Sequence, residues 1–274
     1  MTAAINGTPA TNGTTTTNGT PTTNGTSATN GTPTTNETAA TNGTATNGTT
    51  TTNGTGSDWK PKVIIFDLLT ALLNSWELWD ASTPSGTPEE GAPWRAQYLK
   101  NTFSAGEYVP YETMVKQAAR EVGLPESSSE GVLGGWTGVQ TWPGTGDVLQ
   151  QLKTKGYRLG VLTNCSKKLG NIAAQRAAKA VPGGDSQNVF DAVVTAEESG
   201  FYKPRPEAYQ AILKAMGVEA KDALFVAGSA GDVQGAADAG MKVVWHNNAG
   251  LAKQGNVVPL KEGKTLNETL ADFL

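Results

Sequence analysis

The run Val63-Ile64-Ile65-Phe66-Asp67, continued by Leu68-Leu69-Thr70, decides the fold of this chain. Its four apolar residues predict a buried strand, and the carboxylate that follows them lies in the loop beyond the end of the strand. An α/β hydrolase presents a nucleophile in this way. The run therefore predicts that Asp67 attacks a substrate.

Short apolar strands alternate with helical stretches from Trp59 onward, which is typical of a parallel sheet covered by helices on both faces. One expected helix has core-facing residues at Val148, Leu149 and Leu152, and another begins at Asp232. The predicted fold class is therefore α/β. Five strands are expected, at 63–66, 159–162, 192–194, 224–226 and 242–245.

Residues 1–57 differ sharply in composition from the rest of the chain. They consist mainly of Asn, Gly, Thr, Ala and Pro in a short repeat, with Glu37 as the only charge. A segment so poor in apolar side chains cannot recover its ordering entropy, so we expect a disordered tail. Its Asn-x-Thr triplets, such as that at Asn6, would accept glycans in a secretory pathway. The start of the chain has no apolar signal segment, so we interpret the triplets as spacer.

Charge and cysteine content exclude several classes of protein. The net charge of -4 and the pI near 5.2 leave no basic footprint for nucleic acid. No stretch approaches the ~20 apolar residues of a membrane span. Cys165 is the only cysteine, so an intrachain disulfide is impossible and a cytoplasmic location is expected.

The stretch 76–140 is too long and too aromatic for a simple crossover between the first two strands. Helical periodicity runs from Met114 to Val122 within it. We interpret it as an inserted helical cap that excludes water from a site, with a surface excursion as the alternative. The expected organisation is a tail at 1–57, a core at 58–75 plus 141–274, and a cap at 76–140.

Polar residues stand at the ends of successive predicted strands. Asp67 follows the first strand, Thr163 and Asn164 the second, Lys203 comes after the third, and Asp232 after the fourth. Open α/β sheets bind ligands beyond the carboxyl ends of their strands. Each residue alone fits a turn or a helix cap, but together they predict one site.

In this order the motifs resemble the haloacid dehalogenase superfamily, over about residues 60–274. The resemblance implies a Rossmann-like parallel core with an inserted cap. It rests on Phe66-Asp67-Leu68-Leu69-Thr70-Ala71-Leu72, Leu162-Thr163-Asn164, Lys203-Pro204-Arg205-Pro206 and Ala227-Gly228-Ser229-Ala230-Gly231-Asp232-Val233.

Two departures from the superfamily pattern bear on metal chemistry. Leu69 and Gly228 stand where the magnesium-dependent phosphatases of the superfamily carry acids. Asp67 and Asp232 alone make a poor octahedral oxygen cage, although the Leu69 carbonyl leaves weak binding open. Because phosphoryl transfer relies on the ion, we expect neither phosphatase activity nor a metal cofactor.

The chain is similar to the metal-independent 2-haloacid dehalogenase type, since Trp94-Arg95-x-x-Tyr98 resembles its cap segment. This resemblance implies that Asp67 attacks a carbon and forms an ester that water hydrolyses. Lys203 would keep Asp67 ionised, and Asp232 would position Lys203 or the water. No cofactor is implied. The residues expected to contact substrate are Thr163, Asn164, Arg95, Leu69 and Ser229.

Several alternatives stay open. The same attack would open an epoxide, strained ring or lactone in a small metabolite, and Arg95 has a plain interpretation as a solvent-facing residue. A Cys165–His246 pair is a competing nucleophile, but His246 is expected to be structural, at the sheet edge. A non-catalytic binding or scaffold protein is the alternative of another class. The expected partner is a small molecule, with a carboxylate as one candidate, and a homodimer stays open.

Overall fold

The computed structural model describes residues 59–274, so the predicted tail at 1–57 lies outside the described residues. Residues 59–274 belong to one compact unit. In this part of the chain, no helix combines the length and apolar character needed to cross a bilayer.

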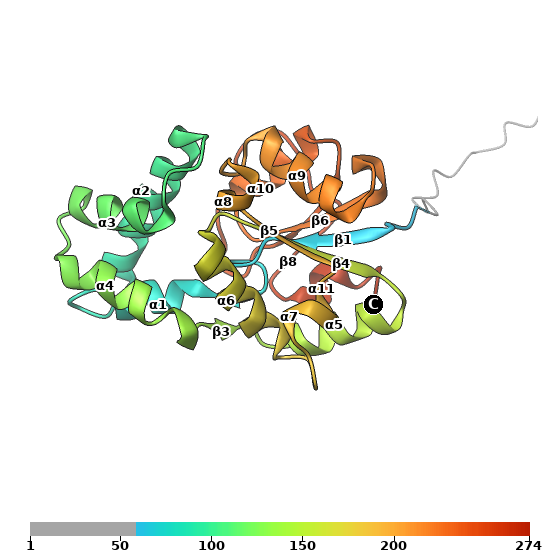
Figure 1. Ribbon diagram of the computed structural model, residues 1–274, viewed down its shortest axis with the longest axis horizontal. Coiled ribbons are helices and arrows are strands. Elements are labelled where there is room, and N and C mark those ends of the chain that lie inside the picture. Colours follow the sequence, from blue (N-terminus) through green and yellow to red (C-terminus); the bar gives the residue numbers. More distant parts are fainter. Residues whose placement is uncertain (1–58) are drawn as a thin grey trace, which may run out of the picture. The chain divides into compact units, whose positions relative to one another are not determined.

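The core is a six-stranded parallel sheet in the order β5-β4-β1-β6-β7-β8 (Figure 1). All five predicted strands are present to within a residue or two, and a short sixth strand, β8, lies beyond β7. The bounds are β1 Val63–Phe66, β4 Arg158–Thr163, β5 Ala192–Thr195, β6 Ala223–Ala227, β7 Lys242–His246 and β8 Glu262–Gly263.

Strand β1 lies at the centre of the sheet and ends where the site begins. Its side chains are fully buried and alternate between two apolar clusters, with Ile64 and Phe66 in one and Val63 and Ile65 in the other. This explains the unbroken apolar run, since a strand buried on both faces has no polar side. Phe66 pairs with both β4 and β6, so Asp67 emerges between two neighbouring strand ends.

Helices cover both faces of the sheet. Residues of α5 (Thr145–Thr154), α6 (Lys167–Ala178) and α11 (Leu266–Leu270) belong to the apolar cluster on one face. Residues of α9 (Pro206–Met216) and α10 (Ala230–Asp238) belong to the cluster on the other (Figure 1). The short elements α7 Ser186–Val189, α8 Ala196–Ser199 and η2 Ala220–Asp222 complete the connections.

Four helices inserted after β1 form the cap, to one side of the sheet in Figure 1. The antiparallel pair of β2 (Leu73–Asn74) and β3 (Gln140–Thr141) joins the places where the chain leaves the core and returns. We call α1 Ser75–Ala81, α2 Pro88–Ala105, α3 Tyr111–Glu121 and α4 Glu126–Gly134 the cap helices; the turn η1 Trp136–Gly138 follows them.

Five aromatic residues of the insertion pack together as its core rather than lying on its surface. Ring centroids lie 4.6 Å apart between Trp79 and Trp94, 5.4 Å between Tyr98 and Tyr111, and 5.6 Å between Tyr111 and Trp136. All five rings are buried. Tilted and edge-to-face contacts at such distances add to the burial of apolar area, so these rings hold the cap helices together.

Two expectations were wrong, one about where a helix begins and one about which strand lies at the edge of the sheet. Helix α10 begins at Ala230 rather than at Asp232, because the Ser229 hydroxyl accepts a hydrogen bond from the Asp232 backbone N–H at 3.4 Å and caps the helix. His246 does not lie on the edge strand, because β8 pairs with β7 on its outer side. Its ring is therefore enclosed by the fold.

Candidate active site

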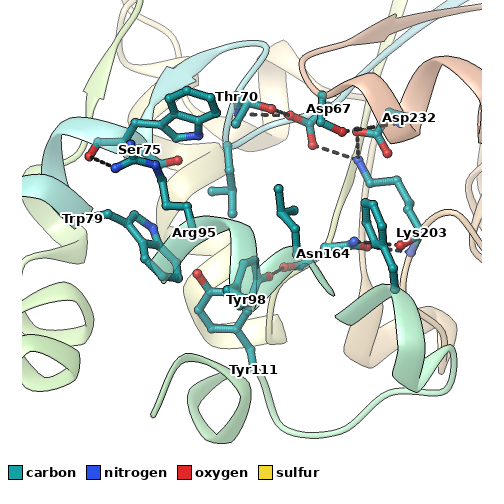
Figure 2. A pocket seen from close by; sticks show the side chains of 15 residues that line it. Asp67, Thr70, Ser75, Trp79, Arg95, Tyr98, Tyr111, Asn164, Lys203 and Asp232 are labelled. Carbon is teal, nitrogen blue, oxygen red and sulfur yellow. Dashed lines mark hydrogen bonds and ion pairs between the residues drawn. The ribbon is translucent and has the colours of Figure 1, made fainter. Parts of the chain in front are cut away.

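A small cavity lies between the ends of the core strands and the cap helices (Figure 2). Its volume is about 60 Å³. Thr163 does not line it. Every other residue that the sequence predicted for the site does: Asp67, Leu69, Arg95, Asn164, Lys203, Ser229 and Asp232.

The two carboxylate oxygens of Asp67 have different surroundings. Oδ2 accepts three hydrogen bonds, from the Thr70 backbone N–H at 3.0 Å, the Thr70 hydroxyl at 2.7 Å and the Ala71 backbone N–H at 3.1 Å. Among the described residues, Oδ1 accepts from the Lys203 ammonium alone, at 2.8 Å. The loop after β1 thus occupies one oxygen and leaves the other with unused acceptor capacity.

Lys203 bridges the two buried acids of the site. Its Nζ donates to Asp67 Oδ1 at 2.8 Å and to Asp232 Oδ2 at 2.9 Å, and its side chain is only 2% exposed. Tyr209 adds a hydroxyl that donates to Asp232 Oδ1 at 3.4 Å. The sequence does not distinguish Tyr209 of α9 from an aromatic residue of the apolar core, so Tyr209 was not predicted as a site residue.

Burial and pairing shift the pKa values of these groups in different directions. Burial alone would raise the pKa of Asp67, but the Lys203 ammonium and the Thr70 donors outweigh it and hold that pKa below its usual value. For Asp232, burial dominates and raises the pKa, with the charge of Asp67 adding to the shift. Burial opposes the charge of Lys203, yet the two acids raise its pKa. Asp67 is therefore the more readily ionised of the two carboxyls, and Asp232 is the readier proton acceptor.

Asn164 is used by the protein backbone. Its side-chain Oδ1 accepts from the Lys203 backbone N–H at 2.7 Å, and its Nδ2 donates to the Lys203 carbonyl at 3.0 Å. Asn164 therefore positions Lys203. Its expected hydrogen bond to the substrate or to the nucleophile stays a prediction. The Thr163 hydroxyl is buried and has no hydrogen-bond partner within residues 59–274.

Three side chains from outside the cavity hold the loop after β1. Successive carbonyls of the loop accept from Trp142 Nε1 at 2.9 Å, His246 Nδ1 at 2.8 Å and Thr145 Oγ1 at 3.1 Å. These carbonyls belong to Thr70, Ala71 and Leu72. The loop is thereby held with its N–H groups towards Asp67, and His246 has the structural role expected of it.

The competing Cys165–His246 nucleophile has no support in the geometry. No hydrogen bond joins the two residues in the described part of the chain, and Cys165 is fully buried away from the cavity lining. Burial also raises the pKa of the Cys165 thiol well above its usual value, which disfavours the reactive thiolate.

Arg95 reaches the cavity from α2, so its interpretation as a solvent-facing residue was wrong. It is 7% exposed and forms an ion pair with Asp80 of α1. Its Nη1 also donates to the Trp76 carbonyl at 3.3 Å, and the guanidinium lies 4.7 Å from the centre of the Trp76 ring. Sequence reasoning did not find Asp80, because the pairing depends on how α1 packs on α2.

Two cap tyrosines, which the sequence did not predict as site residues, also line the cavity (Figure 2). The Tyr98 hydroxyl donates to the Asn164 carbonyl at 3.0 Å and so joins the cap to the core. The Tyr111 hydroxyl is buried and has no hydrogen-bond partner among the residues that the structure describes.

The donor set does not fit a magnesium ion. Both acids are directed at the Lys203 ammonium, which takes the place a cation would need. Within residues 59–274, no group of three or more His, Cys, Asp or Glu side chains is arranged to hold a metal. Magnesium requires several oxygen ligands in near-octahedral geometry.

The loop after β1 includes Leu69 and lies against Gly228, the two positions at which the motifs differ from those of the phosphatases. A Cβ added at Gly228 would overlap Thr70 and the backbone nitrogen of Ala71, so the loop fills the space where an acid would stand. The Leu69 carbonyl, which had been left open as a weak metal ligand, accepts from the Ser75 backbone N–H at 3.3 Å.

Sequence comparison assigns the family. The haloacid dehalogenase-like hydrolase profile matches residues 62–240, which include all four motifs. The chain belongs to the haloacid dehalogenase-like hydrolases. The α/β parallel core with an inserted cap agrees with membership of this family.

Curated relatives and solved structures include haloacid dehalogenases. An (S)-2-haloacid dehalogenase 4A from Burkholderia cepacia is 29% identical over 123 residues, which are 45% of this chain and half of that protein's length. The haloacetate dehalogenase H-2 from Moraxella sp. (strain B) is 24% identical over 70% of this chain and 88% of its own length. Phosphatases are among the other matches.

The fold is shared with a solved L-2-haloacid dehalogenase from Xanthobacter autotrophicus that has chloropropionic acid covalently bound. The TM-score is 0.65 at 17% identity, over 78% of this chain and 99% of that structure. At such identity the likeness concerns the fold.

Proposed function

We propose that this protein hydrolyses a bond at a carbon centre without a metal, with Asp67 as nucleophile, in the manner of a 2-haloacid dehalogenase. The observation that carries the proposal is the Lys203 ammonium, which binds Asp67 and Asp232 at once. A fixed ammonium keeps a buried carboxylate ionised at neutral pH, so Asp67 needs no metal ion to hold its charge.

In the first step, Oδ1 of Asp67 attacks the substrate carbon. Oδ1 is the oxygen with spare acceptor capacity, while Oδ2 is held by Thr70 and Ala71. A carbon–oxygen bond forms, and the leaving group departs with the bonding electron pair. The product of this step is an ester between Asp67 and the substrate carbon.

In the second step, water attacks Cγ of the ester. Asp232 takes the proton of the water, a role that suits a carboxyl whose pKa is raised by burial. The bond between Cγ and the original Oδ1 breaks with its electron pair on Oδ1, which takes the second proton of the water. The product leaves as an alcohol, and Asp67 is again a carboxylate. The covalently bound chloropropionic acid of the Xanthobacter autotrophicus structure supports such an intermediate.

Single-turnover hydrolysis in heavy-oxygen water tests the mechanism directly. The water oxygen should appear in Asp67 and not in the product, because the product carries the original Oδ1. The substrates are 2-chloropropionate, its amide, and small epoxides and lactones, each with and without EDTA. Label in Asp67 and turnover that persists in EDTA support the proposal, whereas a requirement for magnesium contradicts it.

Asp67→Asn supplies the control for that experiment. Loss of a nucleophile of this kind lowers turnover by a factor on the order of 10⁴ or more. Turnover that continues in Asp67→Asn would rule out the ester mechanism. If the whole panel fails with the wild-type protein and no Asp67 ester is trapped, the binding or scaffold alternative gains support instead.

A further inference from the structure

We propose that the substrate of this site is electrically neutral where the cap contacts it, with an uncharged oxygen such as a carbonyl bound by Tyr111 and Arg95. The inference rests on the proposed function and narrows its substrate class. It departs from a carboxylate substrate, for which Arg95 would be the obvious receptor.

The first argument is that the positive charge of Arg95 is already neutralised. Asp80 pairs with its guanidinium, and the Trp76 carbonyl accepts from the same nitrogen. The pair is enclosed, with side chains only 9% exposed for Arg95 and 17% for Asp80. A buried ion pair of this kind leaves no net charge to attract a second carboxylate.

The fit of the cap helices around this pair indicates that it is a built-in feature. A Cβ added at Gly91 of α2 would overlap the Asp80 carboxylate and crowd Arg95. The missing side chain at Gly91 therefore makes the room that Asp80 occupies. Trp76 covers one face of the guanidinium and fixes its orientation.

The balance of charges around the cavity also favours a neutral substrate. Lys203 and Arg95 are the cations, and Asp67, Asp232 and Asp80 are the acids that contact them. A substrate carboxylate would add a further negative charge to a set in which acids already outnumber cations. Like charges in a partly dehydrated space repel strongly, so a neutral substrate is favoured.

The Tyr111 hydroxyl supports an uncharged substrate oxygen independently of Arg95. It lies in the cavity lining and is fully buried, and it makes no hydrogen bond of normal length and angle within residues 59–274, although the Tyr98 side chain beside it acts to lower its pKa. Its neighbour Tyr98 directs its own hydroxyl to the Asn164 carbonyl. A buried donor without a partner is costly, and an uncharged substrate oxygen would satisfy it. Figure 2 shows Tyr111 and Arg95 on the cap side, across the cavity from Asp67 and Lys203.

Beyond this contact there is room for a larger molecule. A second cavity of about 470 Å³ shares Trp76, Arg95, Leu99, Phe103 and Ser229 with the inner one. The inner cavity then holds the reacting carbon and the neutral oxygen, and the outer cavity takes the rest of the substrate.

The test compares 2-chloropropionamide with 2-chloropropionate, which share the reacting carbon and leaving group and differ in charge. We expect kcat/KM of the full-length protein to favour the amide by roughly tenfold or more. In Asp80→Asn, which frees the charge of Arg95, the ratio should move towards the acid by a similar factor. Asp222→Asn, which removes an acid from the surface ion pair with Lys62, is the control and should leave the ratio unchanged.

Tyr111→Phe should lower kcat/KM for the amide by about tenfold and leave the value for the acid nearly unchanged. If neither compound is turned over, the same comparison is made with dissociation constants of propionamide and propionate, measured by calorimetry. Equal or tighter binding of the acid overturns the inference. Turnover that persists in Asp67→Asn or depends on magnesium would instead contradict the proposed function, so the two failures can be distinguished.

Discussion

Lys203 and Asp67 are 136 positions apart in the chain, yet the lysine ammonium lies 2.8 Å from Oδ1 of the aspartate. The contact is buried and is extended by Asp232 on the other side of the ammonium. It ties the first strand of the sheet to the loop before α9. In the proposed mechanism, stability and chemistry therefore depend on the same three side chains.

Thr70→Val should reduce turnover by about 10- to 100-fold, because it removes the hydroxyl that donates to Asp67 Oδ2 at 2.7 Å and a hydrogen bond to a charged group contributes about 1.5–3 kcal/mol. Steady-state kinetics with any substrate accepted by the wild-type protein measures the change. Thr70→Ser keeps the donor and should retain most of the activity. Equal losses in both variants would contradict this role.

Lys203→Met should lower the free energy of unfolding at pH 7 by about 3–5 kcal/mol, since it leaves two buried carboxylates without their cation. In the wild-type protein the pKa of Asp67 is below its reference value of 3.8, so its contribution is present above pH 3.8 and is lost on further acidification. In the variant both acids should have raised pKa values, and their penalty should shrink as the pH falls. Urea denaturation at pH 7 and pH 4.5 should show the difference between the two proteins narrowing.

Gly228→Ala should destabilise the protein by about 1–3 kcal/mol, because the added Cβ overlaps the loop at Thr70. Displacing this loop also displaces the donors to Asp67, so turnover should fall. Gly134→Ala is the matched control, since no atom lies within 4 Å of its added Cβ. Gly228→Asp should likewise fail to create magnesium-dependent phosphatase activity, which an assay with 4-nitrophenyl phosphate would reveal.

His246 should make the stability of the wild-type protein depend on pH below its reference pKa of 6.5. Burial lowers the pKa of His246, so the unfolded chain takes up the proton first and stability is lost as the pH falls through this range. Because the chain has a single histidine, His246→Asn should flatten the change in unfolding free energy between pH 7.5 and 5.5. A slope that is identical in both proteins would exclude His246 as its source.

The sequence by itself determined the strands and the residues at their ends. Four apolar residues in a row predict a buried strand, and parallel strands bring their carboxyl ends to one edge of the sheet. The sequence therefore predicts that Asp67, Lys203 and Asp232 lie in one site.

Only the tertiary structure decided what those residues face and which groups already have partners. The Asp80–Arg95 ion pair and the position of the Tyr111 hydroxyl depend on how the cap helices pack. The structure also shows that the Asn164 amide binds the Lys203 backbone, which the sequence does not reveal. Strand periodicity predicts the edge at which a side chain emerges. Its hydrogen-bond partner is set by packing between segments distant in sequence, for which a single chain carries no periodic signal.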